Sequence, residues 1–315
     1  MTTAAEVDPR RWHRAAFHGL EPLPPDDGRP LLGVWGNCQA ESLRVLLGDG
    51  PDAAFRTVRL PPVFEITAEE LPDLVRTASA LDVLVVQPVR DDYRGLPIGT
   101  AQVRALLRSG ARVVVVPSIH DQGLYPYQAM VHGPGVVEPS PVPYHDLRTL
   151  AEHLTGTRPT PLPVERIRTI AEASVAELAR RERQHGAIPV SDLLRPAGID
   201  AGHTVNHPGN TVLVGLARRI EEALGVGARA TDPGRVLLRA VITPICEDVV
   251  QALDLGQGSR RPEWTIDGIE VTDETVRRAQ LDWYRQHPEV SVAVAAIVKD
   301  RLAGLGVSAL SLIHI

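Results

Sequence analysis

The sequence predicts an α/β fold: a parallel sheet with helices on both faces, followed by a mainly helical C-terminal part. Short apolar runs at 31–35, 81–87 and 112–117 have the length and content of buried strands. Segments at 68–80 and 100–109 carry apolar residues at helical spacing between them. Strands that are apolar throughout and alternate with helices are typical of a parallel sheet covered on both faces.

The stretch 31–47 organises this prediction. After the first strand, Gly36 and Asn37 interrupt the apolar run, and both residue types suit a tight turn. A leucine-rich helix follows, so Cys38 lies at the tip of a strand–turn–helix. A thiol beside the free N–H groups of a helix N-terminus is expected to have a lowered pKa and to serve as a nucleophile. The alternative is a buried structural cysteine.

Polar residues follow three of the predicted strands: Asn37, Cys38 and Gln39; Gln87 and Arg90; and Ser118, His120 and Asp121. The carboxyl ends of parallel strands meet at one edge of the sheet, where ligands bind in such folds. We therefore expect these side chains to converge. Further along, Asn206-His207-Pro208 precedes a helix near Asn210, either as capping residues or to place an imidazole at this edge.

The chain is expected to have four parts. Residues 1–30 form an irregular lead-in, and residues 31–225 form the α/β catalytic domain with a Pro- and Tyr-rich surface excursion near 123–163. Within the α/β domain, residues 190–199 form a short link. Residues 226–309 form a helical part packed on this domain, and 236–255 is expected to be largely helical. The last six residues, 310–315, match the translation of a transposon-end sequencing adapter, so we expect them to be an artefact.

Composition excludes several function classes. The net charge of −6 without a basic run disfavours nucleic-acid binding. The single lysine, Lys299, excludes a Gly-Lys-Ser/Thr phosphate loop. The two cysteines have no paired spacing, which disfavours a disulfide or zinc framework and indicates a reducing cytoplasm. No apolar run reaches membrane-spanning length. The Arg-, Pro- and Ala-rich composition is typical of a GC-rich bacterial genome.

Four motifs together resemble the WcbI family of polysaccharide biosynthesis, whose members are regarded as acetyltransferases that bind coenzyme A. They are Gly36-Asn37-Cys38-Gln39, the strand ending in Gln87, Pro117-Ser118-Ile119 and Asn206-His207-Pro208. The resemblance covers about 31–225 and implies that Asn37, Cys38, Gln39, Gln87, Ser118 and His207 line the site. His120-Asp121 departs from it, since an aromatic residue is expected there. The layout is also similar to that of SGNH-type esterases, with Cys38 in place of their serine.

The leading hypothesis is transfer of an acetyl group from acetyl-CoA to a hydroxyl of a sugar or related acceptor, without a metal, in polysaccharide or secondary-metabolite biosynthesis. His207 acts as general base on the acceptor, or it activates Cys38 for acylation. Backbone N–H groups of the turn and polar side chains would stabilise the oxyanion and bind the substrate. Arginines would bind the phosphates of coenzyme A. The oxyanion and substrate candidates are Asn37, Gln39, Gln87, Ser118, His120, Asp121, Asn206 and Asn210, and the phosphate candidates are Arg44, Arg90 and Arg94.

Two alternatives stay open. A hydrolase would use Cys38 and His207 on an ester with water as acceptor, and a non-catalytic protein would hold a glycan at the same polar strand ends. The apolar faces of the C-terminal helices also fit a homo-oligomer.

Overall fold

A computed structural model describes residues 9–48, 50, 52–256 and 258–307. The chain forms two compact units: unit 1 comprises the described residues up to 119 with 178–194 and 209–237, and unit 2 comprises 120–177, 195–208 and the described residues from 238. The predicted divisions at residues 30 and 225 follow chain order, whereas each compact unit is discontinuous in the sequence. Residues 310–315 lie outside the described part.

Unit 1 contains the predicted parallel sheet. Its strand order is β2-β1-β3-β4, and each neighbouring pair is parallel. The strands are β1 (Leu31–Trp35), β2 (Arg56–Val58), β3 (Val83–Val86) and β4 (Arg112–Val115). Every residue of β1 and β3 is buried, as expected for central strands covered on both faces.

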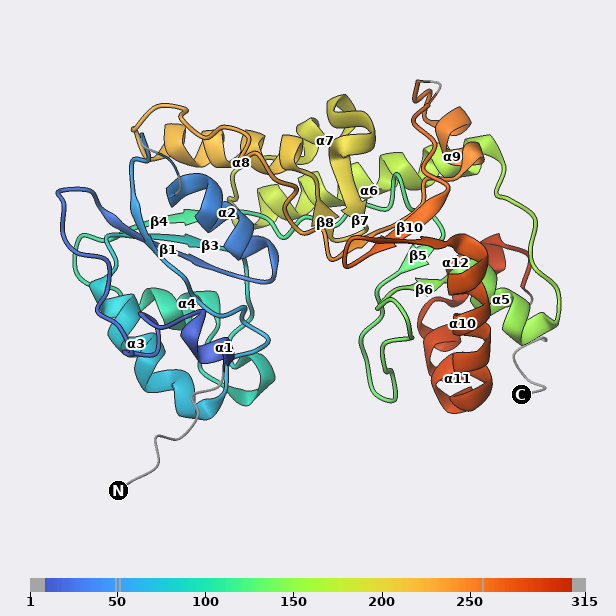
Figure 1. Ribbon diagram of the computed structural model, residues 1–315, viewed down its shortest axis with the longest axis horizontal. Coiled ribbons are helices and arrows are strands. Elements are labelled where there is room, and N and C mark those ends of the chain that lie inside the picture. The colour runs from blue at the N-terminus through green and yellow to red at the C-terminus, as the bar shows by residue number, and fades with distance from the viewer. Residues whose placement is uncertain (1–8, 49, 51, 257, 308–315) are drawn as a thin grey trace. The chain divides into compact units, whose positions relative to one another are not determined.

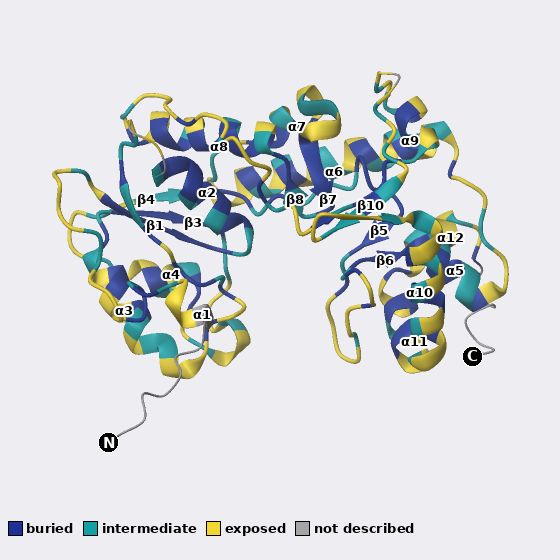
Figure 2. Ribbon diagram, viewed as in Figure 1, coloured by how far each residue is buried: buried dark blue, intermediate teal, exposed yellow. Residues whose placement is uncertain are grey.

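Helices cover both faces of this sheet, which confirms the predicted fold class. Helices α2 (Gln39–Gly48) and α8 (Asn210–Ala223) pack together on one face, and α3 (Leu71–Ala80) and α4 (Thr100–Arg104) lie on the other (Figure 1). Trp35 and Leu84 of the sheet join Leu74 of α3 in one buried cluster, and their strands β1 and β3 are dark blue in Figure 2. Burying one such side chain stabilises the fold by about 1.5–3 kcal/mol.

Residues 9–30 are less irregular than predicted. They contain α1 (Pro9–Trp12), and Phe17 just beyond this helix is fully buried in the same cluster. Among the described residues, short 3₁₀ turns also occur at η1 (Ala68–Glu70) and η2 (Tyr93–Gly95) in unit 1, and at η3 (Gly198–Ala201) in unit 2. Helices α6 (Val164–His185) and α7 (Ser191–Ala197) contribute residues to both units, so the predicted link at 190–199 is wrong.

The segment 123–163 is not a surface excursion. It folds within unit 2 as the antiparallel strands β5 (Gln128–Ala129) and β6 (His145–Asp146), followed by α5 (Leu147–Thr155). Tyr125, Tyr127 and Tyr144 are at most 3% exposed, because each ring joins the interior while its hydroxyl finds a hydrogen-bond partner.

The predicted helix at 236–255 is largely wrong, because this segment contains one two-residue strand, one short helix and otherwise irregular chain. Strands β9 (Val241–Ile242), β10 (Glu263–Ile266) and β11 (Ile269–Thr272) form an antiparallel sheet, while β7 (Gly202–Thr204) pairs with β8 (His207–Pro208). Only α9 (Glu247–Ala252) is helical, beginning after Pro244. Asp267 and Gly268, both at positive φ, form the two-residue turn between β10 and β11.

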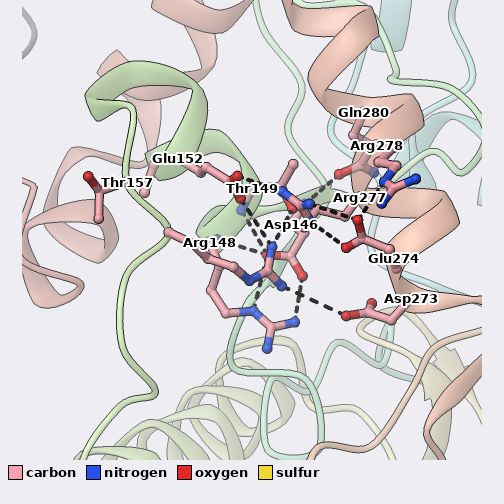
Figure 3. A network of polar contacts seen from close by, with 12 residues as sticks. Asp146, Arg148, Thr149, Glu152, Thr157, Asp273, Glu274, Arg277, Arg278 and Gln280 are labelled. Carbon is pink, nitrogen blue, oxygen red and sulfur yellow. Dashed lines mark hydrogen bonds and ion pairs between the residues drawn. The ribbon is translucent and has the colours of Figure 1, made fainter.

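The C-terminal part is helical as predicted, with α10 (Asp273–Gln286), α11 (Pro288–Ile297) and α12 (Lys299–Gly304) packed on α5. Figure 3 shows the polar contacts between α5 and α10. Asp146 caps α5 by accepting the N–H groups of Arg148 and Thr149, and Glu152 pairs with Arg277 of α10. Over the residues that the structure describes, no helix is long and apolar enough to cross a membrane.

Candidate functional site

The turn after β1 lies at the switch point of the sheet. The chain leaves β1 to reach β2 on one side, while β3 lies on the other side of β1. Residues 36–38 connect β1 directly to α2, which begins at Gln39. Ligands of parallel α/β sheets bind beside the carboxyl ends of the strands at such a point.

A buried amide pair braces this turn. Gln87, which follows β3, accepts the Asn37 N–H through Oε1 at 2.8 Å and donates through Nε2 to Gln39 Oε1 at 3.1 Å. Gln39 in turn donates to the Ile119 carbonyl at 2.7 Å and accepts the Ile119 N–H at 3.0 Å. Gln87 and Gln39 are 2% and 1% exposed, so these bonds form away from water.

Asn37 completes the brace. Its Nδ2 donates to Ser118 Oγ at 2.9 Å, and its Oδ1 accepts the Gln39 N–H at 2.9 Å. The structure therefore brings together four of the predicted site residues, Asn37, Gln39, Gln87 and Ser118. Their polar groups bond to one another and to the backbone, so they hold the shape of the turn.

Only glycine fits at position 36. A Cβ added to Gly36 would lie 2.2 Å from Gln87 Oε1, which is much closer than any real contact. The Gly36 carbonyl also accepts the Val63 N–H at 2.8 Å, which fixes its backbone. The absence of a side chain thus lets Gln87 reach the N–H of the next residue.

The thiol of Cys38 has a different pKa shift from the one predicted. Burial raises the pKa of its thiol above the ordinary value, and hydrogen bonds from the N–H groups of Cys38 and Gln39 lower it by less. The expected lowering of this pKa is wrong, because desolvation of the thiolate outweighs the helix N-terminus.

The three predicted phosphate-binding arginines have different surroundings. Arg44 pairs with Glu41 at 2.8 Å and donates to Thr57, and Arg94 donates to the Phe64 carbonyl. Arg90 lines a hollow of about 500 Å³ in unit 1, together with Arg104 and His185. Arg104 and His185 were not predicted, because they lie on two different helices and belong to no recognisable motif.

Asn210 has a structural role within unit 1. Its Oδ1 accepts the Leu237 N–H at 3.0 Å and its Nδ2 donates to the Arg235 carbonyl at 2.9 Å. These bonds fasten the loop before Leu237 to the beginning of α8.

The remaining predicted residues, His120, Asp121, Asn206 and His207, belong to unit 2. The Asp121 carboxylate accepts the Gly123 N–H at 3.0 Å, and burial raises the pKa of this carboxyl. Asn206 Oδ1 accepts the hydroxyls of Tyr144 and Thr204 at 2.9 and 3.0 Å. The carboxylate and the amide are thus both engaged within unit 2.

His207 packs edge-on against Tyr144, with ring centroids 6.4 Å apart. Burial first, and then the neighbouring His203, lower the pKa of His207 to about 4. The imidazole is consequently neutral near pH 7 and able to accept a proton. Among the described residues, no group of three or more His, Cys, Asp or Glu side chains could hold a metal ion.

Fold and turn define a parallel α/β protein with a braced strand–turn–helix that carries a cysteine at the switch point. The chain belongs to the WcbI family: the family model, described as polysaccharide biosynthesis enzyme WcbI, matches residues 31–229. The predicted resemblance is therefore confirmed. The search of the curated proteins found no match.

The chain is also similar to a solved structure of WcbI, described as a novel polysaccharide biosynthesis enzyme. The two are 22% identical with a TM-score of 0.72, covering 88% of this chain and 99% of that one. At this identity the likeness concerns the fold. That structure is described as the native protein without a disulfide bond between coenzyme A and one of its cysteines.

Proposed function

We propose that this member of the WcbI family transfers an acyl group, in particular acetyl, from coenzyme A to a hydroxyl of a sugar or related acceptor. The braced turn carries the proposal, because it fixes Cys38 at the edge where parallel sheets bind ligands. The mention of coenzyme A and a cysteine in the description of the similar WcbI structure supports this choice of donor. A cytoplasmic location, where acyl-CoA is made, fits the two free cysteines of the chain.

The hollow beside β3 is the proposed place for the phosphates of coenzyme A. It begins at Pro88, next to the brace residue Gln87, and is lined by Arg90 and Arg104 together with Asp91. Arginine is well suited to phosphate because its planar donors bind two oxygens at once. Arg44 and Arg94 are less suited, since each is already bonded within unit 1.

We favour direct transfer over an acyl-cysteine. The raised pKa of Cys38 keeps its thiol protonated near pH 7, where it is a poor nucleophile. On the direct route the acceptor oxygen bonds to the thioester carbonyl carbon while its proton passes to neutral His207. The carbon–sulfur bond then breaks, and the departing thiolate of coenzyme A takes up the proton.

Calorimetric titration of coenzyme A into the full chain tests the donor. We expect saturable binding in the micromolar range, with acetyl-CoA consumed in the presence of a suitable sugar. No binding to folded protein, together with hydrolysis of simple esters, would replace this proposal by the hydrolase. Glycan binding without turnover would indicate the non-catalytic alternative.

Variants at the two candidate residues test the route. Cys38→Ala should keep most of the turnover on the direct route and lose nearly all of it if an acyl-cysteine forms, with Cys246→Ala as the control. His207→Gln should lower turnover at least about 100-fold, the usual contribution of a general base. His13→Gln, an exposed histidine, should change nothing.

A further inference from the structure

Unit 2 contains a second polar group, the Arg261 cluster, which we define as Tyr125, His203, Thr243 and Arg261. Arg261 Nη2 donates to the Tyr125 hydroxyl at 2.7 Å, and this hydroxyl donates to the Gly202 carbonyl at 2.6 Å. Backbone hydrogen bonds between Arg261 and Ile245 also hold the main chain of the arginine in place. The guanidinium is therefore held beside β7 in one orientation.

Several buried polar atoms of this cluster lack a hydrogen-bond partner among the described residues. They are Arg261 Nε, both ring nitrogens of His203, and Thr243 Oγ1. His203 is 9% exposed and Thr243 is 2% exposed, and the Thr243 N–H donates to the His203 carbonyl at 2.8 Å. Leaving one buried polar group without a hydrogen bond costs about 1–3 kcal/mol. Several such groups in one cluster therefore indicate that a polar molecule binds there and supplies the missing hydrogen bonds.

Arg261 gives the cluster one positive charge, and Glu263, two residues further along the chain, has a buried carboxylate oxygen without a hydrogen-bond partner among the described residues. Within the part of the chain that the structure describes, no ion pair joins a carboxylate to Arg261. Asp121 acts on Tyr125 electrostatically, but its carboxylate accepts the Gly123 N–H and interacts with Ser174 and Arg195. A half-buried guanidinium without an ion-pair partner favours an anionic ligand.

We propose that the Arg261 cluster binds the carboxylate of an acidic sugar, such as a uronic acid. One guanidinium supplies a single positive charge and a planar pair of donors, which match one carboxylate, whereas a doubly charged phosphate needs further cations. Neutral His203 and Thr243 add hydrogen bonds without charge. Naming this sugar as the acyl acceptor rests on the proposed function, but the binding site itself does not.

Titration of the full chain with D-glucuronate tests the site without coenzyme A. Binding is followed by NMR of the histidine ring protons, with D-glucose and glucose 6-phosphate as comparison ligands. We expect saturable binding of glucuronate and at least tenfold weaker binding of the other two. An anion beside His203 should also raise the pKa of this histidine, which burial and Arg261 lower to about 4.

Matched variants locate the binding. Arg261→Gln should lose at least tenfold in glucuronate affinity, while Arg260→Gln, the same change at an exposed neighbour, should bind as the parent does. If Arg261→Gln unfolds, His203→Gln gives the same test without removing the charge. Equal binding by the parent and all three variants, equal binding of glucose, or tighter binding of glucose 6-phosphate would overturn the proposal. Failure of the coenzyme A titration alone would leave it standing.

Discussion

The side-chain oxygen of Gln87 lies 2.8 Å from the backbone nitrogen of Asn37, and this bond ties the end of β3 to the turn after β1. The same amide group donates to Gln39 Oε1, so one side chain fixes both sides of Cys38. Gly36 makes this possible because it leaves room for the amide. The turn is thus positioned by its neighbouring strand and does not depend on a ligand for its shape.

Replacing Gln87 with leucine should destabilise unit 1 by about 2–4 kcal/mol, because the Asn37 N–H and Gln39 Oε1 lose their partner in a buried place. Urea unfolding followed by circular dichroism measures this difference. Gln251→Leu, at an exposed position of α9, serves as the control and should change the free energy of unfolding by less than about 0.5 kcal/mol. Equal stability of the two variants would show that the brace contributes nothing.

The sequence was sufficient to predict the parallel sheet of unit 1, because the signals of its strands are local. Apolar runs fixed β1, β3 and β4, and parallel pairing then brought Asn37, Gln87 and Ser118 to one edge. The polar types at the strand ends therefore predicted their convergence. Their role as a brace could not be predicted from the sequence, because it depends on which amide groups form hydrogen bonds with one another in the folded chain.

Unit 2 was less predictable because its strands are short and its pairings join distant segments. Strand β10 pairs with β9 and with β11, yet β9 has only two residues, too few for a periodic pattern. The predicted lowering of the pKa of Cys38 was wrong for a related reason. Its helix N-terminus is visible in the sequence, whereas the burial that opposes it depends on the tertiary structure.

Alkylation of Cys38 by iodoacetamide should be slow at pH 7 and should still accelerate above pH 9, because burial raises the pKa of this thiol. The rate is best followed in a Cys246→Ser variant, which leaves Cys38 as the only cysteine. A rate that levels off below pH 8 would instead support the activated thiol that the sequence indicated.

Stability should fall as the pH drops from about 6.5 to 4, in part because of His145. Burial lowers the pKa of this 1% exposed imidazole to about 4, so the unfolded chain binds the proton first as the pH falls. The contribution is complete above pH 6.5 and amounts to roughly 2–4 kcal/mol lost by pH 4. Urea unfolding at several pH values should show a shallower fall in His145→Gln.

His185→Gln is the matched control for this pH dependence, since His185 is exposed. Its unfolding curve should follow that of the parent across the same range. His203 and His207, whose pKa values are also lowered to about 4, remain in both variants and keep part of the slope. An unchanged slope in His145→Gln would mean that this histidine binds its proton equally well in the folded and the unfolded chain.

The hollow beside β3 leads to the last prediction. Arg90→Gln with Arg104→Gln should weaken coenzyme A binding by about 30- to 900-fold, because each of the two arginines contributes roughly 1–2 kcal/mol through its charged hydrogen bonds to phosphate. The loss should shrink at high salt, where surface charges are screened. The exposed Arg11 offers the control, and Arg11→Gln should leave the affinity unchanged. If the double variant binds as tightly as the parent, the phosphates lie elsewhere, and the affinity of Arg44→Gln then decides whether the opposite face of the sheet holds them.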